Sequence, residues 1–415
     1  MQNPIKSTNR RVVIVGGGLA ALRCTEELRR GGHDGRIAIV TAEPHLPYDR
    51  PPLSKDVLLG KKELGDVLYR DDAFYREHQV DMYLSRRATG LRIREREVLT
   101  NGSAIAFDDL LICTGASPRP FPLKSDLEGI YTLGRVEDAL RLRAALQNGA
   151  PRVVILGAGF IGAEVASAAR SLGLETTIVN LAATPLERAV GPEMGGMLSA
   201  LHADHGARLL CSVSIEEIFG QGRVEELLLT NGERIPCDIL VIGIGSAPNI
   251  GWLEGSGLEL ANGIVCDATL SAGPPGIYAA GDVAWWPNGL FGRGMRCEQW
   301  TNAAEQGRHV ARNMLAGHEG RTPFVGSNYF WSDQYGHRIQ FAGSEVADEV
   351  KIVKGAFENR RFLAYYRKGD QLCGALALNE PKALMLAKQQ IETGTRWDLA
   401  LEAMGHGVPW SAATT

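Results

Sequence analysis

The chain has 415 residues, which is more than one hydrophobic core usually supports and indicates two or three domains. Hydrophobic residues make up 45% of the chain and charged residues 22%, which excludes a disordered or fibrous protein. The net charge of −4 gives no bulk attraction to nucleic acid or to an anionic membrane, so we expect neither as a partner.

Seven cysteines lie far apart in the sequence, without a C-x-x-C pair or the spacing of a metal site. They predict buried thiols in a reducing compartment and no bound metal. An enzyme that passes electrons through its own redox disulfide is therefore disfavoured. The N-terminal segment lacks a signal-peptide pattern, and no apolar run approaches the ~20 residues that span a bilayer, so we expect a cytoplasmic protein.

The first structured segment, RRVVIVGGGLAALRCTEELRRGG at 10–32, predicts a buried strand, a tight turn and a helix. Gly16-x-Gly18-x-x-Ala21 stands at the turn, where the glycines permit the bend and let a pyrophosphate approach the backbone. The next strand, RIAIVTAE, ends at Glu43, about where a carboxylate accepts hydrogen bonds from a ribose. This segment predicts a dinucleotide site.

A second segment, APRVVILGAGFIGAEVASAARSLGLETTIVN at 150–180, repeats this plan with the full pattern Gly157-x-Gly159-x-x-Gly162. Two fingerprints in one chain predict two dinucleotide sites. Asn180 stands at the end of TTIVN, where we expect the ribose carboxylate, and Arg188 is the nearest cation that could attract a 2′-phosphate. This pattern favours NADH over NADPH only narrowly.

The remaining segments complete an α/β fold. A buried strand is expected at 238–249, a strand and turn in GIYAAGDVAWWP, and an amphipathic helix over 297–315. From about Pro323 short alternating strands follow, closed by a helix near 382–392, which predicts a small antiparallel domain. We therefore expect two Rossmann-like domains, as in glutathione reductase, and a small C-terminal α+β domain.

Several further motifs carry a resemblance to one family. They are EPHLPYDRPPLSK at 43–55, LLICTGASPRP at 110–120, VIGIGSAPN at 241–249, IYAAGDVA at 277–284, CEQWTNAAEQ at 297–306 and FWSDQYG at 330–336. Together with GAGFIGAEVA at 157–166, they resemble the FAD-dependent ferredoxin reductases of bacterial oxygenase systems, which include rubredoxin reductases. The motifs run in the family's order over nearly the whole chain.

The resemblance implies an enzyme that passes electrons from NADH, or NADPH, through FAD to a small iron–sulfur ferredoxin. It implies an FAD-binding domain at 1–118 and 246–322, an NAD(P)H-binding domain at 119–245 and a C-terminal domain at 323–415. Combined with the two fingerprints, it gives the following cofactor-binding residues: Gly16, Gly18, Ala20, Ala21, Glu43, Arg50, Lys55, Ala88, Thr114, Gly115, Gly157, Gly159, Gly162, Asn180, Gly281, Asp282 and Trp300.

Three residues receive catalytic roles from the resemblance. Lys55 is expected near the reactive edge of the flavin, Glu164 beside the nicotinamide, and Trp331 beside the flavin on the side of the iron–sulfur partner. Each has a structural alternative: Lys55 as a solvated surface lysine, Glu164 as a carboxylate favoured at a helix N-terminus, and Trp331 as a core aromatic.

Other positions leave similar choices open. Asp282 is either an FAD contact or a helix N-cap, and the two roles can coexist. Where the family has an arginine on the FAD diphosphate, this chain has Gly134 followed by Arg135. Arg308 and Arg312 share one helix face and are either a docking site for an acidic ferredoxin or solvated charges.

Two other functions remain open at this stage. One is reduction of another acceptor on the same fold, namely a rubredoxin, a disulfide or a peroxide. The other is a flavoprotein resembling apoptosis-inducing factor, which also binds nucleic acid and which the acidic balance disfavours. The sequence gives no indication of the oligomeric state.

Overall fold

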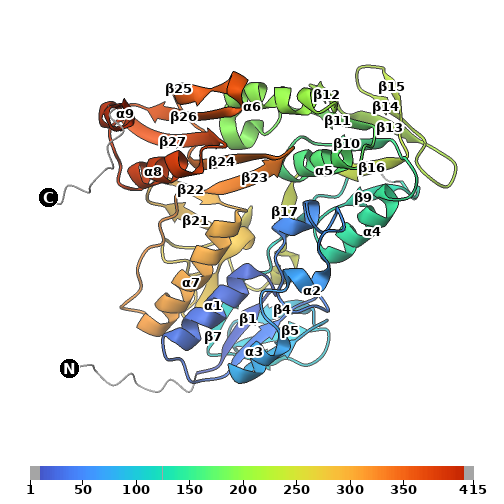
Figure 1. Cartoon of the computed structure of the whole chain (residues 1–415). Helices are drawn as coiled ribbons and strands as arrows, with labels where there is room; N and C mark the ends of the chain where they lie inside the picture. The colour runs from blue at the N-terminus through green and yellow to red at the C-terminus, as the bar shows by residue number, and fades with distance from the viewer. Residues whose placement is uncertain (1–9, 124, 406–415) are drawn as a thin grey trace. The chain divides into compact units, whose positions relative to one another are not determined.

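A computed structural model describes residues 10–123 and 125–405 (Figure 1). By its contacts the chain divides into two compact units. Among the described residues, unit 1 contains 10–49, 64–117 and 246–326, and unit 2 contains 50–63, 118–123, 125–245 and 327–405. Each unit is therefore assembled from three separate stretches of chain.

Unit 1 is built on a parallel sheet of five strands in the order β20-β7-β1-β2-β3. The strands are β1 (Val12–Val15), β2 (Ile37–Val40), β3 (Val80–Tyr83), β7 (Asp109–Ile112) and β20 (Ile277–Ala279). The strands β1, β2, β7 and β20 are buried along their whole length, which explains the uninterrupted apolar runs of β1 and β2. The helices α1 (Leu19–Arg30) and α7 (Trp300–Ala316) run side by side against the sheet (Figure 1).

Smaller elements surround this sheet. They are the helices α2 (Leu64–Val67) and α3 (Asp72–Glu77), the antiparallel strands β4 (Ala88–Arg92), β5 (Glu97–Thr100) and β6 (Ile105–Ala106), the strands β18 (Leu260–Ala261), β19 (Gly263–Val265), β21 (Ala284–Asn288) and β22 (Arg293–Arg296), and the 3₁₀ turns η2 (Gly251–Leu253) and η3 (Gly281–Val283). The strands β8 (Ala116–Pro118) and β17 (Ser246–Pro248) pair with each other where the chain leaves and re-enters unit 1.

Unit 2 contains a second parallel sheet, in the order β12-β11-β10-β16-β9. Its strands are β9 (Ile130–Thr132), β10 (Val153–Leu156), β11 (Thr176–Asn180), β12 (Arg208–Cys211) and β16 (Ile239–Ile242). The other elements are η1 (Pro51–Ser54), the helices α4 (Val136–Leu146), α5 (Phe160–Ser171) and α6 (Glu187–Asp204), and the antiparallel strands β13 (Ile215–Phe219), β14 (Glu226–Leu229) and β15 (Arg234–Pro236).

The C-terminal part of unit 2 is an antiparallel sheet between two helices. Its strands β23 (Phe330–Gln334), β24 (His337–Gly343), β25 (Glu349–Ala356), β26 (Arg361–Lys368) and β27 (Gln371–Leu378) lie in the order β23-β24-β27-β26-β25. The 3₁₀ turn η4 (Phe357–Asn359) joins β25 to β26. Val190 and Leu198 of α6 pack on the face that carries Phe341 and Phe362. The helix α8 (Pro381–Glu392) covers the other face, and α9 (Trp397–Gly405) follows it.

The predicted fold class is confirmed, since the structure holds two parallel α/β sheets and a C-terminal α+β part. The predicted domain boundaries stay a prediction. One difference is that residues 50–63, which we assigned to the FAD-binding domain, make their contacts within unit 2. The reason is that the 3₁₀ turn η1 packs on α4 and α5, which the local sequence does not reveal.

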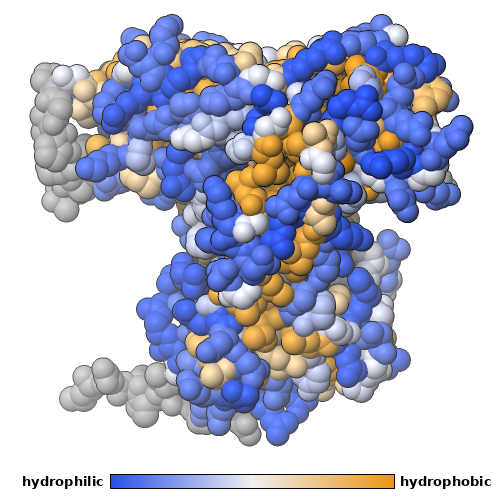
Figure 2. All heavy atoms as spheres, turned by 45° about the vertical axis from the view of Figure 1, so that its right-hand side comes forward, coloured by the Kyte–Doolittle hydropathy of each residue, from blue (hydrophilic) through white to orange (hydrophobic). Residues whose placement is uncertain are grey.

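The surface is mostly polar on the face drawn in Figure 2, where hydrophilic residues (blue) cover most of the exterior and hydrophobic residues (orange) occupy smaller areas. No helix within residues 10–123 or 125–405 is long and apolar enough to cross a membrane.

Candidate functional site

The glycine loop of unit 1 lies at the carboxyl end of β1. Gly16 has φ +124°, and a Cβ atom there would lie 2.1 Å from the carbonyl oxygen of Cys113 at the end of β7. Gly18 is the N-cap of α1, and nothing lies within 4 Å of a Cβ built on it. This open space beside free N-terminal amides of a helix fits the pyrophosphate of a dinucleotide.

The glycine loop of unit 2 repeats this geometry. Gly157 has φ +104°, and its Cβ atom would lie 2.3 Å from the carbonyl oxygen of Gly243. Gly159 is the N-cap of α5 and faces open space. A Cβ atom on Gly162 would lie 1.9 Å from the carbonyl oxygen of Gly157, so only glycine fits where α5 crosses the loop. The residues of both loops therefore fit a dinucleotide.

The strand-end residues differ between the units. In unit 1 the Tyr48 hydroxyl donates to Glu43 Oε2 at 2.6 Å, which holds a half-buried carboxylate beyond β2. In unit 2 Asn180 is buried, and its side-chain amide makes hydrogen bonds to backbone groups of the surrounding loops. Its Oδ1 accepts from the backbone amide of Ala158 at 3.1 Å, and its Nδ2 donates to the carbonyl oxygens of Ala182 and Thr184. Asn180 therefore braces the glycine loop, and its nucleotide contact stays a prediction.

The turn η3 supplies further candidates for FAD in unit 1. Gly281 has φ +75° and precedes Asp282, which is half-buried. The amide of Gly281 donates to Gln306 Oε1 at 2.8 Å, whereas Gln306 Nε2 is fully buried and has no partner among the described residues. An orphaned buried amide of this kind is expected to donate to a bound group or an ordered water. Gln306 was not among the predicted site residues, although it ends the motif CEQWTNAAEQ at 297–306.

Trp300 begins α7 and takes part in a polar triad. Its Nε1 donates to Asp49 Oδ1 at 2.9 Å and to the hydroxyl of Tyr69 at 3.0 Å, and that hydroxyl donates to Asp49 at 2.7 Å. Burial, with the negative charge of Asp49, raises the pKa of Tyr69 well above its usual range, so the hydroxyl stays protonated. The triad fixes the indole ring of Trp300. Asp49 and Tyr69 were also missed, although Asp49 lies inside PYDRPPLSK.

The other predicted FAD contacts of unit 1 have mainly structural surroundings. Thr114 Oγ1 donates to the carbonyl oxygen of Asn249 at 2.8 Å, and Gly115 accepts from the Asn249 amide. Ala20 is buried where α1 meets α7, and a Cβ atom on Gly307 would lie 2.4 Å from its carbonyl oxygen. Ala88 begins β4 and packs against the core. Their binding roles stay predictions.

In unit 2 Lys55 and Glu164 form an ion pair, with 2.7 Å between Lys55 Nζ and Glu164 Oε2. The hydroxyl of Ser54 donates to the same oxygen, and the hydroxyl of Ser332 donates to Oε1 at 2.7 Å. Lys55 is therefore not the solvated surface lysine of the structural alternative, because its ammonium is held by a buried carboxylate. The two serines were not among the predicted residues.

The remaining predicted residues of unit 2 make other contacts. Arg50 Nη1 donates to the carbonyl oxygen of Gly134 at 2.6 Å, so the loop before α4 is tied to η1. Arg135 is the N-cap of α4, and its backbone amide donates to Asp138. Trp331 is half-buried, and the guanidinium of Arg338 lies 5.8 Å from its ring centroid. The ring is therefore at the surface of the sheet and not in its core.

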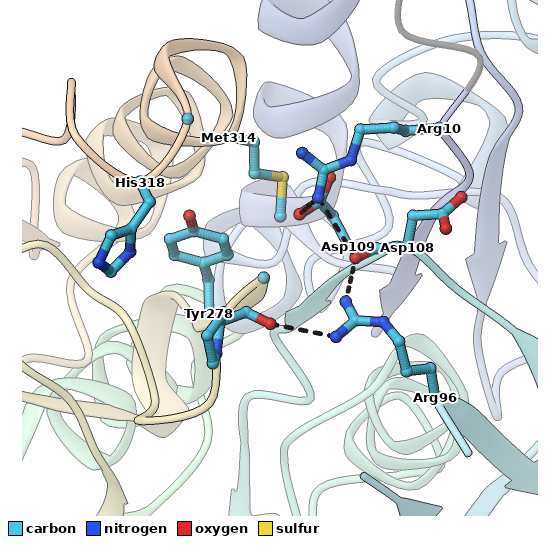
Figure 3. Close-up of a pocket in the computed structure, with 10 residues that line it drawn as sticks. Arg10, Arg96, Asp108, Asp109, Tyr278, Met314 and His318 are labelled. Atoms are coloured by element: carbon cyan, nitrogen blue, oxygen red, sulfur yellow. Dashed lines mark hydrogen bonds and ion pairs between the residues drawn. The ribbon is translucent and has the colours of Figure 1, made fainter. Parts of the chain in front are cut away.

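A cavity of about 290 Å³ lies elsewhere in unit 1 (Figure 3). It is lined by Arg10, Arg96 and Asp109 at the amino end of the parallel strands, and by Tyr278 and His318. The glycine loop stands at the opposite, carboxyl end of the same strands. Ligands of open α/β sheets bind beyond the carboxyl ends, so this cavity is not the dinucleotide site.

Comparison with protein families decides the classification. Residues 10–307 match the family described as pyridine nucleotide-disulphide oxidoreductase, and residues 329–404 match the domain described as reductase C-terminal. The chain belongs to the pyridine nucleotide-disulphide oxidoreductase family. It is therefore an oxidoreductase that uses a pyridine nucleotide, as the two glycine loops predict, and the C-terminal match covers β23 to α9.

Relatives of this oxidoreductase align over almost their whole length. One is the 3-phenylpropionate/cinnamic acid dioxygenase ferredoxin–NAD(+) reductase component of Photorhabdus laumondii, 33% identical over 94% of this chain and 99% of the relative. Rhodocoxin reductase of Rhodococcus erythropolis is 32% identical over 92% of this chain and 89% of its own. Putidaredoxin reductase, solved in a covalent complex with putidaredoxin, matches with a TM-score of 0.90 and 29% identity over 97% of this chain and 99% of its own. The predicted family resemblance is confirmed.

The family name includes a disulphide, but the seven cysteines of this oxidoreductase are all free. Five are buried, and burial raises the pKa values of Cys24, Cys113 and Cys297 well above the usual thiol range. Because the thiolate is the reactive form, these cysteines are unsuited to carry electrons.

Proposed function

We propose that the protein is an NADH:ferredoxin oxidoreductase that uses FAD and serves an oxygenase. The observation that carries this proposal is the presence of two dinucleotide-binding loops in a chain whose cysteines are all free and mostly buried. Such a chain has sites for a flavin and a nicotinamide but no thiol pair to reduce a disulfide or a peroxide. The full-length similarity to ferredoxin–NAD(+) reductase components and to rhodocoxin reductase supports an iron–sulfur protein as the acceptor.

Unit 1 would hold FAD and unit 2 would hold NADH. The glycine loop at Gly16 and Gly18 and the helix N-terminus of α1 would bind the FAD pyrophosphate, and Glu43 its ribose. The orphaned amide of Gln306 and the adjacent Asp282 would complete that site. When bound, FAD accepts a hydride from NADH and passes the electrons singly to the iron–sulfur partner.

The residues of the chain contribute mainly by positioning. The loop at Gly157 and Gly159 would bind the pyrophosphate of NADH and fix where the nicotinamide lies. Glu164 is the fifth residue of the same helix, so its carboxylate and the Lys55 ammonium form a fixed pair of charges near that loop. Holding two reactants in a reactive arrangement can contribute roughly 7–11 kcal/mol to the lowering of a barrier, and no acid or base is required for hydride transfer.

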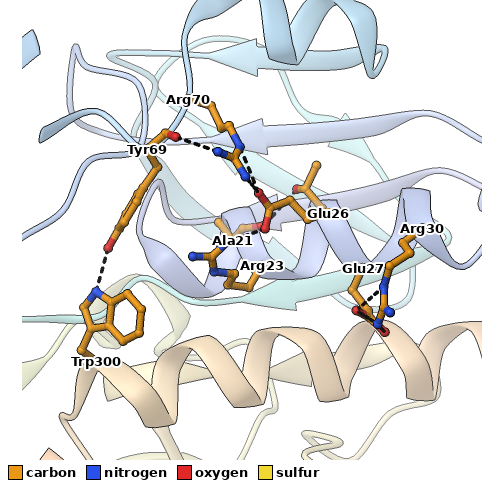
Figure 4. A network of polar contacts seen from close by, with 9 residues as sticks. Ala21, Arg23, Glu26, Glu27, Arg30, Tyr69, Arg70 and Trp300 are labelled. Carbon is orange, nitrogen blue, oxygen red and sulfur yellow. Dashed lines mark hydrogen bonds and ion pairs between the residues drawn. The ribbon is translucent and has the colours of Figure 1, made fainter. Parts of the chain in front are cut away.

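For the ferredoxin, we propose a docking surface in unit 1 that is made of Arg23 and Arg30 on α1, Arg308 and Arg312 on α7, and Arg70 between α2 and α3. Figure 4 shows Arg23, Arg30 and Arg70 with the carboxylates that they contact. Two carboxylates organise these cations. Glu26 pairs with Arg23 and Arg70, and Glu27 pairs with Arg30 and Arg312. The surface thus carries more positive than negative charge.

The exposure of these groups favours an acidic partner. The side chains of Arg30 and Arg312 are 69% and 57% exposed, whereas that of Glu27 is 9% exposed. Burial works to raise the pKa of Glu27, but hydrogen bonds from the two arginines outweigh it and hold its pKa below the ordinary value. The anion stays buried as an organising group while the cations reach solvent. Arg312 is therefore not a simple solvated charge, and Arg308 lies half-buried one turn before it.

The test of the function is an anaerobic titration of the purified protein with NADH and then NADPH, followed by a [2Fe–2S] ferredoxin. Bleaching of the flavin absorbance by NADH and reoxidation by the ferredoxin are expected. A flavoprotein that NADH leaves oxidised, or that reduces a disulfide or a peroxide faster than the ferredoxin, would contradict the proposal. Binding of DNA at low salt would instead favour a role like that of apoptosis-inducing factor.

The docking surface has its own test. Charge reversal by Arg312→Glu should raise the KM for the ferredoxin and weaken its dependence on salt, since steering by opposite charge is screened. Reduction of ferricyanide by NADH should stay unchanged. A matched control is Arg234→Glu, which reverses an exposed and paired arginine in unit 2. Equal effects of the two substitutions would exclude α1 and α7 as the docking surface.

The free cysteines also support a reducing compartment, and we propose the cytoplasm as the location.

A further inference from the structure

The first strand of the C-terminal sheet, β23, is fastened along helix α5 by three contacts. The rings of Phe160 and Phe330 meet edge to face with 4.7 Å between their centroids. One helical turn on, Ser332 Oγ donates to Glu164 Oε1 at 2.7 Å. Almost one further turn on, the backbone amide of Tyr335 donates to the hydroxyl of Ser167 at 2.7 Å.

The spacing of these contacts places them in one row. Positions 160, 164 and 167 lie on one face of a helix, and Phe330 and Ser332 lie on one face of a strand. The hydrophobic contact and the Tyr335 hydrogen bond are of the kind that fastens any strand to a helix. The middle contact is different, because it ends on the carboxylate that pairs with Lys55.

The two oxygens of Glu164 are held in different ways. Oε2 accepts from Lys55 and from Ser54, which are neighbours at the C-terminal end of η1. Within residues 10–123 and 125–405, Ser332 is the one donor to Oε1. A carboxylate held at one oxygen can still turn about its last bond, whereas donors on both oxygens fix its plane. Ser332 therefore determines the direction in which Glu164 presents Oε2 to the Lys55 ammonium.

The hydroxyl of Ser332 is itself held. The side chain is fully buried, and Gln334 Nε2, which is also buried, donates to Ser332 Oγ at 3.0 Å. Because that lone pair is occupied, the hydroxyl hydrogen of Ser332 points to Glu164. A buried ion pair is stable only when its remaining polar atoms are satisfied, and this relay from Gln334 through Ser332 satisfies Glu164.

We propose that Ser332 is a positioning residue for hydride transfer, and that it acts through Glu164 on the Lys55–Glu164 pair. This inference rests on the proposed function, in which that pair stands beside the nicotinamide-binding loop. It gives the C-terminal sheet a part in the first half of the reaction, in addition to any contact with the ferredoxin.

The test compares Ser332→Ala with Ser167→Ala in the holoenzyme. Each substitution removes one hydrogen bond between α5 and β23, but only the first bond ends on Glu164. The limiting rate of flavin reduction by NADH and the apparent Kd for NADH are measured by anaerobic stopped flow, with Tm beside them. Ser332→Ala should lower the limiting rate about tenfold, as expected for a misplaced reacting group, whereas Ser167→Ala should change it less than about twofold.

A double-mutant cycle with Glu164→Gln then tells a positioning role from a general loss of structure. If Ser332 acts through Glu164, the double variant should be no slower than Glu164→Gln alone. Additive losses, or equal rates for Ser332→Ala and Ser167→Ala, would overturn the inference while leaving the proposed function intact. A wild-type rate for Glu164→Gln would instead overturn the assigned role of Glu164, and the inference with it.

Discussion

The two glycine loops have the same backbone and different surroundings. The amide of Gly16 donates to the carbonyl oxygen of Val40 at 2.8 Å, and that of Gly157 donates to Val179 at 2.7 Å. Strand register agrees, since Val15 pairs with Val40 and Leu156 pairs with Val179. The residues of the two units can therefore be matched one by one.

This match changes the interpretation of Asn180. The residue directly after Val40 is Thr41, which is buried and would contact a Cβ atom on Gly17. The residue directly after Val179 is Asn180, which bonds to Ala158, the counterpart of Gly17. Both residues brace the glycine loop. The counterpart of Glu43 is Ala182, so unit 2 has no carboxylate at the level where unit 1 has one.

The third position of the loop differs as well. Unit 1 accommodates Ala21, which is fully buried, whereas unit 2 has Gly162 in close contact with the loop. The helix of unit 2 thus lies nearer to its loop. The comparison shows that two positions of the same dinucleotide-binding fingerprint can vary independently. The third small residue determines how closely the helix packs on the loop, and the residue beyond the second strand determines whether a carboxylate is available for the ribose.

The largest effect is expected from Gly162→Ala. Its Cβ atom would lie 1.9 Å from the carbonyl oxygen of Gly157, so the helix N-terminus must move away from the pyrophosphate. A shift of this size should slow flavin reduction by NADH about 100-fold, with the flavin retained. Stopped-flow reduction measures it. In contrast, Ala21→Gly in unit 1 should lower stability by only about 1 kcal/mol, because it adds backbone freedom without a clash. If Ala21→Gly slowed flavin reduction as much as Gly162→Ala, the proposed difference in helix packing between the two units would be contradicted.

Nucleotide choice should respond to Ala182→Glu, which supplies the carboxylate that unit 1 has at Glu43. A carboxylate accepts from the ribose hydroxyls and repels a 2′-phosphate. The ratio of kcat/KM for NADH to that for NADPH should rise about tenfold, or about 1.4 kcal/mol. The neutral control Ala182→Gln should shift the ratio less. If neither variant changed the ratio of kcat/KM values, the match between Ala182 and Glu43 would not identify the residue beside the ribose.

Asn180 and Thr41, the two residues that brace the glycine loops, differ in the number of hydrogen bonds that their side chains make. Asn180→Ala leaves the Ala158 amide and two carbonyl oxygens without the side-chain partner, and should cost about 2–3 kcal/mol of unfolding free energy. Thr41→Ala removes one acceptor, that for the Glu43 amide, and should cost about 1 kcal/mol. Urea denaturation of both variants measures the difference. Equal losses would show that the additional bonds of Asn180 contribute nothing.

The smallest effect concerns the amino ends of the sheets. Val12 pairs with Asp109 in unit 1, and its counterpart Val153 pairs with Ile239 in unit 2. Burial raises the pKa of Asp109 to about 6, although Arg10 lies 2.7 Å from it and acts to lower the pKa. Since this folded-state pKa exceeds the unfolded value, the folded protein binds the proton more tightly, and stability falls as pH rises through the window between them.

Asp109→Asn removes that titration. The wild-type protein should lose about 1 kcal/mol of stability between pH 5 and pH 7 that the variant keeps. Asp238 provides the contrast, since a hydrogen bond from Arg152 holds its pKa at about 2, and its stabilisation is lost as pH falls from the unfolded-state pKa towards that value. Thermal unfolding of Asp109→Asn between pH 5 and pH 7, and of Asp238→Asn between about pH 2 and pH 4, tests both signs. A wild-type pH profile for Asp109→Asn would contradict the assigned cause.

Much of the fold follows from the sequence because its signals are local. Uninterrupted runs such as Val12–Val15 and Val153–Leu156 are typical of buried parallel strands, and the glycines that follow them mark the loops. The antiparallel C-terminal sheet and the helix α8 follow from alternation and spacing in the same way.

The parts that the sequence did not reveal depend on contacts between distant residues. Ser54 and Glu164 are 110 positions apart, and Trp300 and Asp49 are 251 positions apart. No local pattern distinguishes a serine that holds a carboxylate from any other buried serine. The bracing role of Asn180 was missed for a related reason, because only the strand register shows that it corresponds to Thr41.

The contacts between β23 and α5 also have a consequence for the folding of the protein during its synthesis. Ser332 follows Glu164 by 168 positions, which takes roughly 10–30 s to synthesise at 5–20 residues per second. During that interval the carboxylate lacks the Ser332 donor, and the helix that carries it lacks the strand β23 on that face. Unit 2 therefore stays incompletely assembled until the last quarter of the chain has been translated.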